Sequence, residues 1–99
     1  MEYNSAEEKQ MNRQELYSKA EILKHMAHPV RLCILIKLIR EGPRNVSALQ
    51  GCMDVAQPTI SQHLGKLKAA GIVAARRHGK EVEYQISNES IHKVIQALS

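Results

Sequence analysis

Residues 57–84, QPTISQHLGKLKAAGIVAARRHGKEVEY, are the stretch that decides the fold. The first half predicts a helix that begins at Pro58, because a proline fits the first turn of a helix. Gly71 is typical of the position just after a helix and predicts its end. Between these two residues, apolar side chains recur at helical spacing and predict a stripe that faces the core: Ile60, Leu64 and Leu67.

The second half of the stretch predicts a β-hairpin over residues 72–77 and 82–87. In the second strand Val82, Tyr84 and Ile86 alternate with polar residues, as a half-buried strand requires. Residues 78–81, which include a glycine and basic side chains, form the predicted tip. A short helix with a polar outer face, followed by such a hairpin, is typical of a winged helix-turn-helix, whose second helix enters a DNA groove.

Four more helices are expected around this stretch. The apolar residues of 12–27 lie on one helical face, and residues 30–40 are apolar nearly all round. The length of the second segment favours a buried central helix, although a buried strand is the alternative. A short helix is expected over residues 46–53, and Asn88 can cap a last helix with an apolar stripe over residues 91–98.

The expected fold is therefore mainly α with a β-hairpin: a winged helix-turn-helix of five helices and a two-stranded antiparallel wing. A single domain is expected over residues 11–99, after a flexible N-terminus over residues 1–10. The 99 residues bury only a marginal core, and dimerisation would help by burying more apolar surface.

Positive charge is concentrated in the middle of the chain. The formal net charge is +4, and the segment from Arg44 to Lys80 holds six basic residues against the single acidic residue Asp54. This distribution indicates a face that binds a polyanion, and uneven charge on a solvated surface is the plainer alternative. The absence of Phe and Trp disfavours a single-strand binder, which stacks bases on aromatic side chains.

The candidate DNA contacts lie in two places. One is the outer face of the predicted helix that begins at Pro58, which we call the reader helix, and the other is the β-hairpin, which we call the wing. Glutamine can pair with adenine through two hydrogen bonds, hydroxyl groups can contact bases or phosphates, and basic side chains neutralise phosphates. A glycine at position 65, inside the predicted helix, makes the helix less stable by about 1 kcal/mol than an alanine would. A close approach to DNA or to another helix would explain its presence, and a tolerated defect is the alternative. The candidates are Gln57, Thr59, Ser61, Gln62, His63, Lys66, Arg76, Arg77, His78 and Lys80.

Over about residues 16–98 the chain resembles the ArsR/SmtB family of bacterial winged-helix repressors. The motifs that carry the resemblance are His28-Pro29-Val30-Arg31-Leu32, Ser61-Gln62-His63-Leu64, Leu67, Gly71-Ile72-Val73, Arg77, Gly79 and Tyr84. The resemblance implies a homodimer that represses an operon by binding a palindromic double-stranded operator, and that an inducer, here unidentified, releases. It also implies a dimer interface built from the terminal helices, and their apolar stripes agree with this: Leu16, Ala20, Leu23, Ile91, Val94, Ile95 and Leu98.

The resemblance also implies where metal ligands would stand, and good ligands are missing there. Asn45 and Ser47 occupy the positions of the family's thiolate site, and neither is a ligand for a soft metal. The site on the last helix would fall on Asn88 and Ser90, with His92 displaced. We therefore predict no metal site and no cofactor.

Cys33 and Cys52 are a candidate redox pair. If the helices over 30–40 and 46–53 form a hairpin, both cysteines lie about 10 Å from its turn at ~1.5 Å per residue, and so at the same end. A disulfide there would strain the helix that supports the reader, which makes a thiol-based redox-sensing repressor an alternative function. Two buried structural thiols are the plainer interpretation.

Other classes of protein find little support. There is no glycine-rich phosphate loop, nucleophile elbow or cluster of metal ligands, so we do not expect an enzyme. The sequence shows no signal-peptide pattern and no apolar run long enough to span a bilayer, which predicts a cytoplasmic protein without a membrane partner. A winged helix used for protein interaction, without an operator, is the other alternative.

Overall fold

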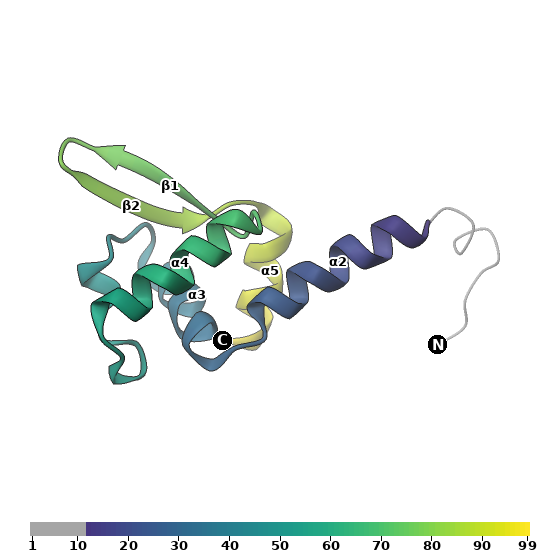
Figure 1. Ribbon diagram of the computed structural model, residues 1–99, viewed down its shortest axis with the longest axis horizontal. Coiled ribbons are helices and arrows are strands. Elements are labelled where there is room, and N and C mark those ends of the chain that lie inside the picture. Colours follow the sequence, from purple (N-terminus) through teal and green to yellow (C-terminus); the bar gives the residue numbers. More distant parts are fainter. Residues whose placement is uncertain (1–11) are drawn as a thin grey trace.

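The computed structural model describes residues 12–99, so the flexible segment expected over residues 1–10 lies outside the described part of the chain. The elements in chain order are α2 (Arg13–Met26), α3 (Pro29–Glu41), α4 (Gln57–Ala69), β1 (Val73–His78), β2 (Glu81–Ile86) and α5 (Glu89–Leu98). Figure 1 shows α3, α4 and α5 gathered together, with the hairpin projecting to one side and α2 extending away on the other.

Most helices begin at a residue that can cap them. Asn12, His28 and Asn88 each accept a hydrogen bond from a backbone N–H of the first turn, at 2.8, 3.1 and 2.9 Å respectively. These bonds satisfy N–H groups that have no partner inside the helix. α4 has no side-chain cap and carries Pro58 in its first turn instead, as the sequence predicted.

The prediction of a helix over residues 46–53 is wrong. Two short 3-10 turns, Ser47–Leu49 and Cys52–Asp54, take its place, so the described residues hold four α-helices rather than the five expected. Gly51 lies between the turns, and glycine is a poor helix former. Met53, expected on the inward face, has a left-handed φ of 52° and is 57% exposed.

The core is aliphatic and centres on α3, which contacts α4, α5 and β2. The prediction of a buried central helix is therefore confirmed, and the strand alternative is wrong. No helix within residues 12–99 has both the length and the apolar character needed to cross a membrane. The fully buried side chains are Ile34, Leu35, Leu49, Cys52, Ile60, Leu64, Leu67, Ile72 and Ile95.

The wing is a regular antiparallel hairpin. Its pairing runs from Val73 opposite Ile86 to His78 opposite Glu81, which leaves Gly79 and Lys80 as a two-residue turn. Gly79 has a φ of 61°, and a positive φ at the first position of a tight hairpin turn favours glycine.

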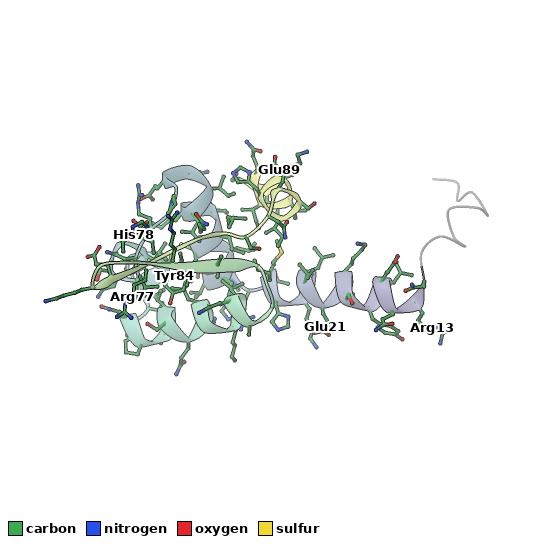
Figure 2. The ribbon with its side chains drawn as sticks, turned by 90° about the horizontal axis from the view of Figure 1, so that it is seen from above. Arg13, Glu21, Arg77, His78, Tyr84 and Glu89 are labelled. Carbon is green, nitrogen blue, oxygen red and sulfur yellow. The ribbon has the colours of Figure 1, made fainter. Side chains whose placement is uncertain are left out.

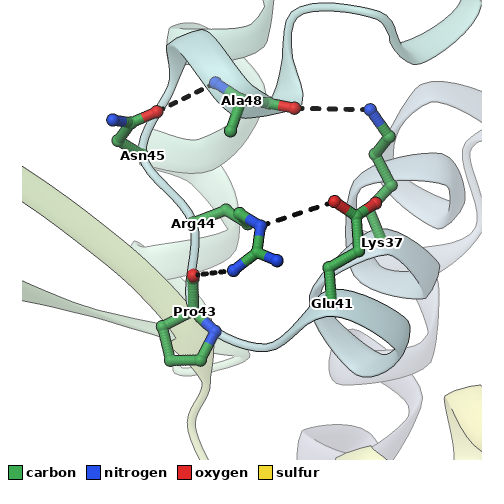
Figure 3. A network of polar contacts seen from close by, with 6 residues as sticks. All are labelled: Lys37, Glu41, Pro43, Arg44, Asn45 and Ala48. Carbon is green, nitrogen blue, oxygen red and sulfur yellow. Dashed lines mark hydrogen bonds and ion pairs between the residues drawn. The ribbon is translucent and has the colours of Figure 1, made fainter.

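A short third segment anchors this hairpin. Arg44, in the loop after α3, exchanges two backbone hydrogen bonds with Tyr84 of β2, at 3.0 and 2.8 Å. Polar contacts hold the same loop, as Figure 3 shows: Asn45 Oδ1 accepts from the backbone N–H of Ala48 at 2.9 Å. Lys37 Nζ donates to the carbonyl of Ala48 at 3.3 Å. Asn45, at one position where the resemblance would place a thiolate, therefore bonds to the backbone of a 3-10 turn.

Candidate nucleic-acid interface

The outer surface of α4 is polar because its three large apolar side chains turn inward. Ile60, Leu64 and Leu67 are completely buried against the rest of the domain. Thr59 is half-buried at the start of the helix. The predicted contact residues that are exposed on α4 are Gln57, Ser61, Gln62 and Lys66.

His63 does not share this outward orientation, so the expectation for it needs correction. The side chain is half-buried, and its Nδ1 accepts a hydrogen bond from Arg31 Nε at 3.0 Å. Its ring lies 4.6 Å from the ring of His28, centroid to centroid. Burial lowers the pKa of His63, and the nearby His28, Arg31 and Lys66 lower it further. The sequence analysis missed Arg31 and His28 as neighbours of the reader helix, although both lie in the motif His28-Pro29-Val30-Arg31-Leu32.

The cations of the wing are exposed. Arg76, Arg77 and Lys80 form no ion pair within residues 12–99. His78 Nε2 lies 3.1 Å from Glu83 Oε1 on the opposite strand, a contact that becomes an ion pair when the imidazole is protonated. Figure 2 shows Arg77 and His78 toward the outer end of the hairpin, at the opposite end of the molecule from Arg13.

The base of the wing is tied to the end of α4. Gly71 follows the helix with a φ of 76°, and the backbone N–H of Ile72 returns to the carbonyl of Leu67 at 2.9 Å. Ser87, at the end of the hairpin, donates from its backbone N–H to the carbonyl of Ile72 at 3.0 Å. In Figure 1 the hairpin leaves the C-terminal end of α4 and runs back beside it. The polar face of α4 and the exposed cations of the wing are thus held by one short connection.

Known proteins share this architecture. A family model described as a helix-turn-helix domain matches residues 26–76. The crystal structure of the transcriptional repressor PagR of Bacillus anthracis superposes with a TM-score of 0.81 at 34% identity, covering 89% of this chain and 100% of that chain. The chain belongs to the ArsR/SmtB family of winged-helix transcriptional repressors.

Two further relatives in this family are longer than the described domain. The biofilm growth-associated repressor of Agrobacterium fabrum is 40% identical over 79 residues, which are 80% of this chain and 67% of that protein. The transcriptional repressor SmtB of Mycobacterium tuberculosis is 41% identical over 88 residues, which are 88% of this chain and 64% of that protein. This chain therefore spans about two thirds of the length of these relatives.

The predicted interface residues of this family member fall into two groups. Ile91 and Ile95 lie in the core of the protomer itself, at 5% and 0% exposed, so their side chains are already covered. The other group is exposed on α2 and α5: Leu16, Ala20, Leu23, Val94 and Leu98. Tyr17, which the sequence analysis did not select, is 68% exposed beside them on α2. An open, largely apolar cleft of about 370 Å³ separates α2 from α5.

Cys33 and Cys52 are neighbours, as the hairpin argument predicted, although a 3-10 turn rather than a helix carries Cys52. Both thiols are free. Burial raises the pKa of Cys52 to about 12, and the neighbouring Cys33 thiol contributes to the shift. Since the thiolate is the form that reacts with oxidants, the surroundings of Cys52 disfavour oxidation near neutral pH. Within residues 12–99 no three His, Cys, Asp or Glu side chains gather into a group that could hold a metal ion.

Proposed function

We propose that this chain represses transcription by binding a palindromic duplex operator as a homodimer, and that an inducer releases it. The observation that carries the proposal is the pairing of two surfaces: an exposed polar face on α4 and exposed, unpaired cations on the adjoining wing. Relatives with the same fold bear the name repressor, including PagR of Bacillus anthracis and SmtB of Mycobacterium tuberculosis.

The two surfaces have different tasks. α4 enters the major groove by its N-terminal half, where Gln57, Ser61 and Gln62 are exposed and able to contact base edges. Arg76, Arg77 and Lys80 of the wing neutralise phosphates and so supply affinity that does not depend on sequence. The reader helix therefore carries specificity, and the wing carries much of the salt-dependent affinity.

Exposed apolar side chains on the terminal helices support the homodimer. Leu23 of α2 and Leu98 of α5 are 55% and 64% exposed, and a second protomer would cover them. A twofold axis between protomers would place the two copies of α4 on successive major grooves, about 34–36 Å apart. The operator would then be a palindrome with half-sites one helical turn apart.

The test begins with duplexes selected by the purified protein from a random library. Binding to the selected duplex and to a scrambled duplex is then measured at several salt concentrations, for the natural chain, Gln62→Ala and the control Gln96→Ala. Gln62→Ala should lose about 1–3 kcal/mol on the selected duplex and little on the scrambled one. Gln96 is an exposed glutamine of α5, outside both α4 and the wing, and its removal should change neither.

Failure of the selection to enrich any sequence would refute operator recognition. Binding without a salt dependence would instead favour a winged helix that contacts a protein, because release of counterions makes DNA binding fall steeply with salt. Equal losses on both duplexes would remove Gln62 from base recognition while leaving DNA binding in place.

A further inference from the structure

One arginine of α3, Arg31, forms hydrogen bonds to both α2 and α4. Arg31 of α3 donates from Nε to His63 Nδ1 at 3.0 Å, and from Nη1 to the backbone carbonyl of His25 at 3.0 Å. His25 lies in the last turn of α2, and His63 lies in the middle of α4. A single half-buried guanidinium therefore fixes the reader helix relative to the end of a terminal helix.

The bond to His63 also selects one form of the imidazole. A guanidinium only donates hydrogen bonds, so His63 Nδ1 must carry a lone pair, and the proton of the neutral ring sits on Nε2. His28 is in the same condition, because its Nδ1 accepts from the backbone N–H of Val30 at 3.1 Å. A protonated His63 would have no acceptor for Arg31 and would place a second positive charge 3.0 Å from the first.

The surroundings of His63 all favour this neutral form. α3 contributes His28 and Arg31, and α4 contributes Lys66, which together with burial depress the imidazole pKa. From α2, the backbone carbonyl of His25 accepts a hydrogen bond from Arg31. The imidazole Nδ1 of His25 lies 2.8 Å from the backbone carbonyl of Glu21. No carboxylate is paired with His63 within the described residues.

We propose that Arg31 is a positioning residue for operator recognition: it holds α4 against the end of α2 through a neutral His63, and thereby sets the orientation of the neighbouring Gln62. This inference rests on the proposed operator binding. Arg31 acts through α4 and not by its own charge, which separates it from the phosphate-binding cations of the wing. Loss of Arg31 should lower specificity, and loss of a phosphate contact should lower affinity for all duplexes alike.

The first test uses the protein without DNA. Nitrogen NMR of the histidine side chains should show His63 with a proton on Nε2 alone near pH 7.5, and a mixture of both tautomers in Arg31→Met, whose side chain has no N–H donor. Arg40→Met is the matched control, since Arg40 is an exposed arginine of the same helix. A mixture in the natural chain, or an unchanged ring in Arg31→Met, would overturn the proposal.

The second test measures the ratio of affinities for the selected and the scrambled duplex. Arg31→Met should lower this ratio about tenfold, the size expected when a hydrogen bond from a charged group is lost, and should leave the salt dependence unchanged. Arg40→Met should keep the ratio. A loss of affinity that is equal on both duplexes, with a smaller salt slope, would make Arg31 a phosphate contact and overturn the proposal.

The pH profile supplies a readout that does not require Arg31→Met to fold. In the natural chain the ratio should fall on acidification with the midpoint at which the His63 ring titrates by NMR. His63→Asn, whose amide oxygen Oδ1 is bonded to Cγ as Nδ1 is and can still accept from Arg31, should retain a ratio that does not change over that range. A ratio in the natural chain that ignores the His63 titration would overturn the proposal. If the natural chain does not discriminate between duplexes at any pH, operator binding itself fails, whereas the tautomer test stands on the protein alone.

Discussion

Gly65→Ala should stabilise the protein and weaken its binding to DNA. Gly65 lies on the exposed side of α4, and within residues 12–99 a Cβ added there would meet no atom within 4 Å apart from the adjoining backbone of its own helix. Its φ is not in the left-handed region, so alanine fits the backbone without strain. Alanine in a helix interior is more favourable than glycine by about 1 kcal/mol, and nothing in the protomer opposes that gain.

This gain corresponds to a rise in melting temperature of about 4–8 °C for a domain of this size. Thermal unfolding followed by circular dichroism measures it, at equal protomer concentrations because the melting temperature of a dimer depends on concentration. A melting temperature that stays the same or falls would refute the reasoning that α4 is helical and unobstructed at this position.

The effect on binding separates the two explanations for the glycine. Among the helices of residues 12–99, none packs closely enough against Gly65 to be the reason. If DNA approaches the backbone here, the added methyl group should lower operator affinity although the fold is more stable. An unchanged affinity, measured on the selected duplex, would leave Gly65 as a tolerated defect.

Three other predictions address the wing, the dimer and the buried thiol. Arg77→Ala should weaken binding to selected and scrambled duplexes alike, and should lower by about one unit the slope of log affinity against log salt concentration. Arg13→Ala, at the far end of α2, should do neither. An unchanged slope in Arg77→Ala would remove Arg77 from the phosphate contacts. Leu98→Asp should produce monomers in sedimentation experiments, because it places a charge on an exposed apolar side chain of α5; a persistent dimer would place the main interface elsewhere. Stability should fall as pH rises above 9.0, because burial raises the pKa of Cys52 to about 12 and the unfolded thiol loses its proton first. Cys52→Ala should flatten that decline in chemical denaturation, and an equal slope in both proteins would contradict the assignment.

The sequence predicted the reader helix and the wing well because their signals are local. Ile60, Leu64 and Leu67 recur at helical spacing, and all three are fully buried. The tip of the hairpin follows from a glycine among basic residues, and the observed register leaves Gly79 and Lys80 as the turn. In both cases the residues that decide the structure lie within a few positions of one another.

The segment over residues 46–53 shows where periodicity misleads. Helical spacing is present at Val46, Leu49 and Met53. The helical structure is nevertheless interrupted at Gly51, and Met53 is exposed to solvent. Leu49 and Cys52 are both buried, although they belong to two separate 3-10 turns. Apolar spacing identified the segment as one that faces the core but did not distinguish between these two kinds of helix.

His63 was misjudged for a different reason. It lies three residues after Ile60 and four before Leu67, so helical geometry places it at the edge of the buried stripe, a signal that the sequence does contain. Its partner could not be found in this way, because Arg31 lies 32 residues earlier in the chain. A helical pattern gives the face on which a side chain lies, but only the packing of α3 on α4 gives the group that meets it.

The same packing limits how an inducer can act on the reader helix. A ligand changes DNA binding only if it favours one arrangement of the protein over another. Arg31 bonds to both the end of α2 and α4, so a shift of α2 against α3 strains a polar contact that reaches His63 directly. Within residues 12–99 no side-chain hydrogen bond joins α5 to α4, and Ile91 and Ile95 pack into the shared core instead. A ligand that displaces α2 therefore has a polar route to α4 through Arg31, whereas a ligand bound at α5 reaches α4 through apolar packing and through the wing.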